Sequence, residues 1–413
     1  MPNQQLASPP TTSNLTSRLA SIDAYRGMVM FLMMAEVLEL SKLAEVYPES
    51  NLLAWLKFHT SHVEWVGCSL HDLIQPSFTF LVGVSLPFSI ASRLLKGSGY
   101  GSMFLHAVWR SLLLVVLGIV LRSLGKPATD FRFDDTLTQI GLGYCALFLI
   151  ALTPRWNQVL SAVLILAGYW LLFAMWPLPA ADFDYEAVGV PKDWPHLMSG
   201  FAAHWNKNSN PAWAFDVWFL SLFPYSSVYP FHSGGYSTLS CIPTLATMIL
   251  GLLAGGMLAD GKLAGGKGTA KGGYKMQTLL LATVGACLIA AGWALDHYGI
   301  CPNVKRIWTP SFALFSGGIC FVWLAVLHAI CDSWNAKAWA FPFMVFGSNS
   351  ILAYGMSWVL EKPLKELLLR HFGEAPFLVL GEAWEHVMLG SAVLFLMWLI
   401  LLWLHRQRVF VRI

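Results

Sequence analysis

Residues 59–87 read HTSHVEWVGCSLHDLIQPSFTFLVGVSLP, and this stretch combines a cluster of titratable side chains with an apolar run. Residues 59–72 alone contain three His, one Glu and one Asp. From Phe80 onward the stretch is apolar enough to enter a membrane as a helix. Because ionisable groups at the mouth of a hydrophobic helix are costly to keep, they indicate a functional site.

The composition of the whole chain agrees with membrane insertion. Of its 413 residues, 56% are hydrophobic and only 12% are charged, whereas about 25% of the residues in a soluble domain are charged. So few charges cannot cover a soluble surface, and we predict an all-α integral membrane protein. Apolar segments of about 20 residues mark ten spanning helices. The predicted spans are 27–44, 71–93, 107–124, 136–153, 157–176, 238–258, 277–295, 309–331, 339–360 and 386–404.

The distribution of Lys and Arg predicts the orientation of the spans. Basic residues collect in segments 262–275 and 406–412, which lie on the same side as the N-terminus if successive spans alternate. Short cytoplasmic loops carry an excess of Lys and Arg, so both termini are predicted to be cytoplasmic. The polar residues 1–17 are predicted to form a disordered cytoplasmic tail without a cleavable signal peptide. Residues 18–413 then form a single transmembrane domain, with one large outer loop over 177–237.

The approach to the second span is predicted to be irregular. Pro76 and Pro87 would kink or terminate a local helix. We therefore expect a re-entrant polar stretch before this span, since irregular backbone at membrane depth is tolerated where it lines a cavity. In the first span, Glu36 and Glu39 are three residues apart and share a face. Glu36 is the deeper of the two, and a carboxylate there faces protein or a water-filled cavity.

Three further features each leave two interpretations open. Arg26, at the inner mouth of the first span, is either a positive-inside anchor or a contact for an anionic ligand. The run Gly347-Ser348-Asn349-Ser350 is either a close helix contact or a polar lining of the same cavity. Aromatic and acidic residues in the outer loop 177–237 suit a sugar, but they equally suit an interfacial aromatic belt.

Several stretches resemble one known family when they are taken together and in order. They are RLASIDAYRG (18–27), HVEWVG (62–67) leading to DLIQPSF (72–78), LTQIG (137–141), STLSCIP (237–243), KRIWT (305–309) and FGSNS (346–350). This set resembles the heparan-α-glucosaminide N-acetyltransferase family of multi-span membrane acyltransferases and its bacterial relatives.

The resemblance implies an activity and a location. The family moves an acetyl group from cytoplasmic acetyl-CoA to an amino sugar or glycan on the outer side of a membrane. For this chain it implies a bacterial inner membrane and a periplasmic acceptor. The family's active-site His matches His62. Its partner Asn falls at Val37, beside Glu36, and an Arg of its Leu-Gln-Arg-Leu-Gly motif falls at Gln139.

A mechanism follows from the residues together with the resemblance. His62 is predicted to act as a general base, or as a nucleophile that is transiently acetylated. Asp72 or Glu36 would fix its tautomer. Asn349 and Ser350 would donate hydrogen bonds to the developing oxyanion. At the inner mouth, planar guanidinium groups suit the phosphates of CoA. The predicted cofactor-binding residues are Arg26, Arg93 and Arg110, together with Ser350.

Two interpretations from other classes remain open. The first is a small-sugar transporter or binding protein that uses the same cavity without chemistry. The second is a zinc site built from His59, His62, Glu64 and His71, whose spacing fits no standard pattern, so no metal is predicted. The expected partners are a small sugar acceptor and membrane lipid but no nucleic acid, and a homodimer is left open.

Overall fold

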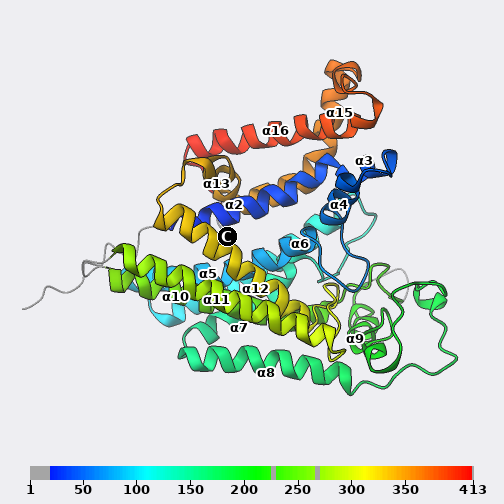
Figure 1. The fold of residues 1–413 in the computed structure, drawn as a ribbon, viewed down its shortest axis with the longest axis horizontal. Coiled ribbons are helices and arrows are strands. Elements are labelled where there is room, and N and C mark those ends of the chain that lie inside the picture. Colours follow the sequence, from blue (N-terminus) through cyan, green and yellow to red (C-terminus); the bar gives the residue numbers. More distant parts are fainter. Residues whose placement is uncertain (1–18, 225–228, 266–269, 412–413) are drawn as a thin grey trace, which may run out of the picture.

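The computed structural model describes residues 19–224, 229–265 and 270–411, so the predicted disordered tail lies outside the described residues. Within these ranges the chain is all α, apart from one isolated bridge between Val66 and Val304. The long helices run side by side along the length of the molecule (Figure 1). The predicted all-α class is therefore confirmed.

The α-helices account for most of the described chain. They are α2 (Ala20–Met34), α3 (Leu40–Val46), α4 (Asn51–Thr60), α5 (Ile74–Leu95), α6 (Tyr100–Ser123), α7 (Thr136–Ala151), α8 (Arg155–Ala174), α9 (Pro211–Leu220), α10 (Cys241–Gly265), α11 (Ala270–His297), α12 (Pro310–Leu327), α13 (Phe341–Ser348), α14 (Ser350–Val359), α15 (Glu361–Phe372) and α16 (Glu385–Arg406). The shorter elements are the 3₁₀ helices η1 (Ala35–Leu38), η2 (His71–Leu73), η3 (Glu186–Val188), η4 (Gly200–Trp205), η5 (Thr238–Ser240), η7 (Ala338–Ala340), η8 (Ala375–Phe377) and η9 (Glu382–Trp384), and a π-helical turn, η6 (His328–Ser333).

Seven helical segments of the described chain are long and apolar enough to cross a membrane. They are His71–Leu95, Tyr100–Ser123, Arg155–Ala174, Thr238–Asp260, Gly273–His297, Pro310–Ser333 and Glu382–Arg406. The chain is thus an integral membrane protein. The other three predicted spans are shorter or broken: α7 has 16 residues, α2 ends at Met34, and Asn349 separates α13 from α14. The count of ten spans and their orientation stay predictions.

Close backbone packing holds α5, the helix that follows the His-rich stretch. A Cβ at Gly251 or Gly255 of α10 would collide with the carbonyl groups of Phe80 and Val84 in α5. Small residues four apart let two helices approach this closely. The N-terminal end of α5 is therefore fixed against a second spanning helix, and so is the polar segment that leads into it.

Neither Pro76 nor Pro87 terminates the helix of the second span, and a kink at either stays a prediction. Pro76 lies in the first turn of α5, where a missing N–H costs little, and α5 continues through Pro87 to Leu95. The irregular backbone lies earlier, between the end of α4 at Thr60 and the start of η2. There Gly67 N–H donates to the Asn303 carbonyl at 2.8 Å, beside the isolated bridge. Whether this segment re-enters a membrane stays a prediction.

The helix bundle has two ends. We call one the His62 end, because the segment that carries His62 leads into the start of α5, and the other the Arg93 end, because Arg93 lies in the last turn of α5. The segment 177–237 lies at the His62 end, at the right of Figure 1, and contains α9, η3 and η4. Trp205 is fully buried there, and the Trp65 indole donates to its carbonyl at 3.1 Å. Trp205 is therefore core and serves neither a sugar platform nor an interfacial belt, whereas Trp218 is exposed.

Candidate active site

His62 and Asp72 form a hydrogen-bonded pair. His62 Nδ1 lies 2.8 Å from Asp72 Oδ1. Asp72 is 1% exposed, and its other oxygen, Oδ2, accepts bonds from Val63 N–H at 3.2 Å, Ser69 N–H at 3.0 Å and Ser69 Oγ–H at 3.0 Å. A buried carboxylate needs such partners. The irregular segment therefore folds around Asp72, and this orients the carboxylate toward His62.

Lys305 completes this cluster from a distant part of the chain. Its Nζ lies 3.3 Å from Asp72 Oδ1 and 3.0 Å from His62 Nδ1. An ammonium has donors only, so a bond from Lys305 would need Nδ1 as an acceptor, whereas a bond to the Asp72 carboxylate needs Nδ1–H. We assign the Nδ1–H tautomer because the contact with buried Asp72 is the shorter one, at 2.8 Å, and Nε2 is then the acceptor. Lys305 then pairs with Asp72.

The electrostatic environment keeps His62 neutral. Burial lowers the pKa of His62 below its usual range, the neighbouring Lys305 ammonium lowers it further, and Asp72 acts in the opposite direction. A neutral imidazole with a free Nε2 can accept a proton or attack an electrophile. The arrangement thus suits either role predicted for His62.

A second His–carboxylate pair lies directly beside the first. His71 Nε2 is 2.9 Å from Glu36 Oε1, and the His62 and His71 rings have centroids 4.3 Å apart. Glu36, predicted as one of two possible partners of His62, is therefore the partner of His71. His59 is used locally, because its Nδ1 accepts from Leu70 N–H at 3.2 Å.

His62, His71 and Glu36 line a cavity of about 610 Å³ at the His62 end, whereas Asp72 does not line it. Its wall comes from segments far apart in the sequence, namely the end of α2, the start of α5, and α14 with α15. The polar and aromatic lining residues are Glu36, His62, His71, Gln75, Thr136, Lys305, Tyr354, Ser357, Trp358, Glu361, Lys362 and Lys365.

A second cavity of about 500 Å³ extends toward the Arg93 end. All four predicted cofactor-binding residues line it: Arg26, Arg93, Arg110 and Ser350. His106 lines it as well, and the remaining lining residues are mostly apolar side chains of α5, α6 and α7. A cationic end and an apolar body suit an elongated ligand that carries phosphates at one end.

Two of the arginines are held in place by neighbours. Arg26 Nη2 donates to Ser85 Oγ at 3.0 Å. Arg110 Nη1 donates to the Tyr144 hydroxyl at 3.1 Å, and its guanidinium lies 4.7 Å from the centre of that ring. The Nε of Arg110 is buried and has no protein partner. A buried guanidinium with a spare donor is suited to an anionic ligand.

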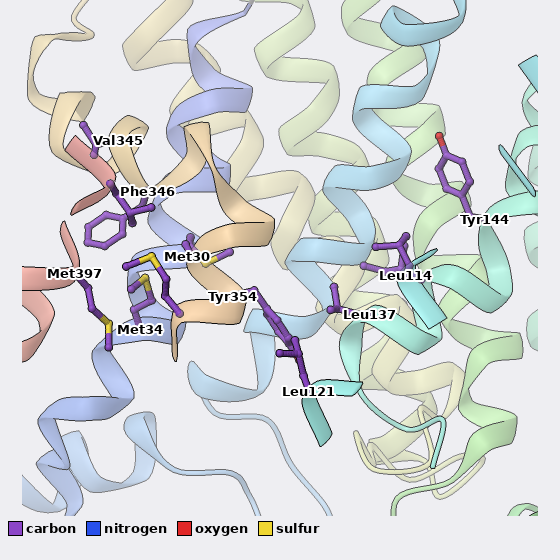
Figure 2. Close-up of a cluster of buried hydrophobic side chains, with 14 of the residues drawn as sticks. Met30, Met34, Leu114, Leu121, Leu137, Tyr144, Val345, Phe346, Tyr354 and Met397 are labelled. Atoms are coloured by element: carbon purple, nitrogen blue, oxygen red, sulfur yellow. The ribbon is translucent and has the colours of Figure 1, made fainter. Parts of the chain in front are cut away.

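The two cavities meet at Thr136 and Tyr354, which line both. Three elements run from one cavity into the other in residue order. On α5, residues 78–93 line the arginine cavity and 74–75 line the His62 cavity. On α2 the order is Arg26 and Met30, then Met33 and Met34, and on α14 it is Ser350 and Ile351, then Ser357 and Trp358. Figure 2 shows Tyr354 between the methionines of α2 and the leucines of α6 and α7. Tyr354 therefore separates the arginine cavity from the His62 cavity.

Comparison with known proteins gives two curated relatives, whereas no family model matches the chain. Heparan-alpha-glucosaminide N-acetyltransferase of Homo sapiens is 24% identical over 376 residues, which cover 83% of this chain and 53% of the relative. The Mus musculus protein of the same name is 24% identical over 401 residues, covering 86% and 55%. The chain is a distant relative of these acetyltransferases. It spans about half the length of the curated relatives it matches.

The positions at which the chain departs from the acetyltransferase motifs have structural roles here. Val37 is 1% exposed and packs in the hydrophobic core. Gln139 is fully buried, and its amide donates to the Phe133 carbonyl at 2.8 Å and to the Ser237 and Thr238 carbonyls at 3.5 and 3.4 Å. Gln139 therefore ties the loop before α7 to the segment before α10.

The structure does not bring Asn349 to the site. Its Nδ2 donates to the Val409 carbonyl at 2.9 Å, and its Oδ1 accepts from Val411 N–H at 2.8 Å. Asn349 lines neither of the two cavities at the centre of the bundle. Both ends of its amide are used by the C-terminal segment, and the predicted oxyanion contact therefore has no support in this arrangement.

The metal alternative also lacks support in the geometry. His59 bonds to the backbone, and Glu64 Oε2 accepts from the Trp194 indole at 3.3 Å and lies 3.2 Å from His196 Nε2. These groups point to different parts of the His62 end. Across the described residues, no three His, Cys, Asp or Glu side chains gather as metal ligands.

The sequence argument missed Lys305 and Tyr354 as site residues. Lys305 is 6% exposed and stands in the quoted KRIWT stretch, so a basic residue before an apolar span was a usable signal. Nothing in the sequence marks Tyr354, which becomes a site residue because α14 lies between the two cavities.

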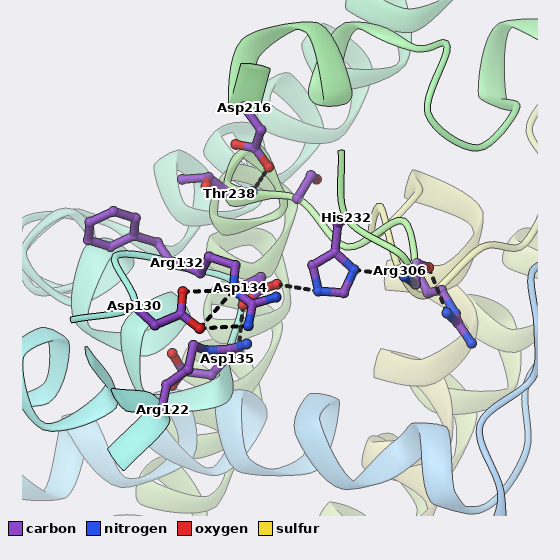
Figure 3. A network of polar contacts seen from close by, with 12 residues as sticks. Arg122, Asp130, Arg132, Asp134, Asp135, Asp216, His232, Thr238 and Arg306 are labelled. Carbon is purple, nitrogen blue, oxygen red and sulfur yellow. Dashed lines mark hydrogen bonds and ion pairs between the residues drawn. The ribbon is translucent and has the colours of Figure 1, made fainter. Parts of the chain in front are cut away.

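A polar network at the His62 end supports the site (Figure 3). Arg122 and His232 pair with Asp134 at 2.6 and 3.2 Å. Arg306 connects this network to the His62 segment, because its guanidinium donates to the carbonyls of Gly234 at 2.6 Å and Val63 at 3.3 Å. Burial raises the pKa of Asp216 to about 7 and lowers that of His232 to about 4. Both shifts follow from burial, which disfavours the charged form of each side chain.

Proposed function

We propose that this chain is a membrane acetyltransferase that takes acetyl from acetyl-CoA at the Arg93 end and transfers it to an amino sugar at the His62 end. One observation carries the proposal: at Tyr354, a cavity lined by three arginines meets a cavity lined by His62, the histidine that is paired with Asp72. The distant acetyltransferase relatives support the same reaction class. With the predicted orientation, the donor is cytoplasmic and the acceptor is on the outer, periplasmic side.

The donor cavity fits the chemistry of CoA. Arg26, Arg93 and Arg110 supply cationic donors for its phosphates, and the buried, unpartnered Nε of Arg110 adds one more. The apolar part of the cavity, between these arginines and Tyr354, suits the uncharged arm of CoA. In this arrangement the thioester would lie toward Tyr354 and His62.

The acceptor side supplies the base. As the acceptor nitrogen attacks the thioester carbonyl, it loses a proton to His62 Nε2, and CoA leaves as the thiolate, which takes up this proton. Asp72 stabilises the imidazolium that forms and keeps Nδ1 protonated. If His62 is instead acetylated first, the same tautomer presents Nε2 as the nucleophile.

Labelled acetyl-CoA provides the test. Purified full-length chain is incubated with radiolabelled acetyl-CoA and glucosamine, and N-acetylglucosamine is measured. His62→Ala should abolish transfer and keep acetyl-CoA binding. His371→Ala is the matched control, because this His is exposed on α15 and lines neither cavity. Undiminished transfer by His62→Ala, or failure of the wild type to bind acetyl-CoA, would refute the proposal.

A transporter remains the second candidate, because two open cavities separated by one side chain also suit alternating access. Uptake of labelled glucosamine into proteoliposomes without acetyl-CoA would favour it. Acetylation without uptake of the free sugar would exclude it.

A further inference from the structure

Lys207, in segment 177–237, is a buried cation without a partner. It is 8% exposed. Within the part of the chain that the structure describes, its ammonium group forms no hydrogen bond and no ion pair. Its contact is with the face of Trp194, whose ring centre lies 5.3 Å from Nζ. A buried charge without a partner is costly to keep, so Lys207 indicates a ligand that is absent from the chain itself.

The turn that carries Lys207 is built by three asparagines. The Asn206 side chain bonds to the N–H and the carbonyl of one residue, both at 2.9 Å. Asn208 donates to two backbone carbonyls at 2.8 and 3.1 Å, and Asn210 caps the start of α9. Asn208 also has a φ of +53°, which is uncommon for a residue other than Gly. The side chains on either side of Lys207 thus fix the turn, whereas Lys207 itself contributes no bond to it.

Arg306 supplies a second cation beside Lys207. Its guanidinium donates to the Gly234 carbonyl at 2.6 Å and to the Val63 carbonyl at 3.3 Å, and its buried Nε has no partner. A Cβ at Gly234 would lie 2.8 Å from Arg306 Nη1, and a Cβ at Gly235 would lie 3.0 Å from Lys207 Cγ. The two cationic side chains therefore contact adjacent glycines and lie close to each other.

The carboxylates around this pair are already used. Glu64 acts on the charge of Lys207, but its side chain is 65% exposed and its Oε2 is shared by an indole and an imidazole of segment 177–237. Asp134 is separated from Arg306 by His232 (Figure 3) and pairs with that imidazole. Burial and the charge of Arg306 lower the pKa of Lys207, and Glu64 acts in the opposite direction. The described residues thus leave two cations together without an anion.

The pair of cations lies next to the His62 cavity. Lys305, which lines that cavity, and Arg306 both face the ring of Tyr236, at 5.9 and 5.2 Å from its centre. Val63, whose carbonyl accepts from Arg306, directly follows His62 in the chain. The cations therefore continue from the wall of the cavity past Tyr236 to Arg306.

We propose that Lys207 and Arg306 form an oxyanion-binding site, which takes a carboxylate, sulfate or phosphate group. Lys207 supplies a point charge, and Arg306 adds a guanidinium whose Nε–H is still unused. The oxyanion comes either from a free anion or from a substituent of the acceptor sugar. Only the second source rests on the proposed function, because the site itself does not require acetyl transfer.

Thermal unfolding tests the site without acetyl-CoA. Purified full-length chain in detergent is titrated with sodium sulfate or sodium phosphate, with sodium chloride added to keep the ionic strength constant. An anion that binds only the folded chain stabilises it, so at about 100 times its Kd the unfolding midpoint of the wild type should rise by a few degrees. Both anions also stabilise proteins in general, so the result is the difference between the wild type and a variant.

The variant Lys207→Met removes the cation and keeps the length of the side chain. Its midpoint should respond less than that of the wild type to either anion. Without added anion its midpoint should equal or exceed that of the wild type, because an unpaired buried charge is removed. Lys192→Met is the matched control, since Lys192 is an exposed lysine of the same segment that pairs with Glu186. It should respond like the wild type.

Two outcomes would overturn the site. The first is an equal response of the wild type and Lys207→Met to sulfate and to phosphate. The second is a strong loss of stability in Lys207→Met without anion, which would show that Lys207 has an internal structural role.

Glucosamine and glucosamine 6-phosphate distinguish the two sources of the oxyanion. If the acceptor carries it, glucosamine 6-phosphate should be acetylated with a kcat/KM at least about tenfold above that of glucosamine, since a charge-assisted bond has this effect. Lys207→Met should remove the preference, and Lys192→Met should keep it. A midpoint that depends on phosphate, without any preference between the acceptors, assigns the site to a free anion. If the wild type transfers no acetyl group but its midpoint still depends on Lys207, the proposed function fails and the oxyanion site stands.

Discussion

The two cavities are built in different ways. The arginine cavity is lined by the interiors of regular helices, so its cations need only the right positions along α2, α5 and α6. The His62 cavity is lined by an irregular segment, a helix start and residues near position 305. Cations that bind an anion need only lie near it, whereas groups that transfer a proton must lie within hydrogen-bond distance of each other. The irregular backbone lies at the His62 cavity, where proton transfer is proposed.

The largest effect is expected from breaking the geometry at the His62 end. Asp72→Asn should reduce kcat by about 10³-fold or more, because the amide can stabilise the wrong tautomer of His62 and no longer balances its charge. Acetyl-CoA affinity should change little. Steady-state kinetics and equilibrium binding on the same preparation would check this. A loss of donor affinity equal to the loss of kcat would mean that the two cavities are not separate units.

A bulkier side chain at the boundary should have the next largest effect. Tyr354→Trp should lower kcat by about 100-fold, because a displacement near 1 Å of the reacting groups has this cost. Tyr354→Phe keeps the ring and should stay near the wild type. The measurement is kcat against acetyl-CoA affinity. An active Tyr354→Trp would show that the acetyl group does not pass this side chain.

A smaller effect is expected at the arginine cavity. Arg110→Met removes charge-assisted hydrogen bonds and should weaken acetyl-CoA binding by about 10- to 100-fold with kcat largely kept. Calorimetry at low and high salt would measure it, and the loss should shrink at high salt. Arg155→Met is the control, since Arg155 pairs with Asp260 outside both cavities. Equal losses in both variants would argue against a specific phosphate contact.

The smallest change is expected from a substitution that alters the pKa of His62. Lys305 lowers the pKa of His62, so Lys305→Met should raise it. Activity needs neutral His62 and is lost as pH falls through this pKa, so the acidic limb of the rate profile should move to higher pH. Lys362→Met, which removes an exposed cation from the same cavity, should leave the limb in place. A shift to lower pH would contradict the assigned tautomer.

The sequence allowed the arginine cavity to be predicted better than the His62 cavity. Hydropathy locates the helices and the distribution of Lys and Arg predicts their orientation, so Arg26, Arg93 and Arg110 were predicted together at one mouth of the bundle. The His62–Asp72 pair is local and was also found. Lys305 reaches the site across 243 residues, and only the tertiary path of two loops brings it there. Of the two carboxylates offered as partners of His62, Asp72 takes this place and Glu36 pairs with His71, which spacing along the chain could not decide. Glu36 lies in η1, and the chain changes direction directly after η1 at Glu39, whose φ is +49°.

Asn349 holds the C-terminal segment through both ends of its amide, and Val411 in that segment lines the donor cavity. The chain beyond α16 is thus part of the wall that surrounds CoA in the proposed function. A tag fused directly after residue 413 would pull on the Asn349 contact, and a weakened donor affinity in such a preparation would reflect the fusion rather than the enzyme.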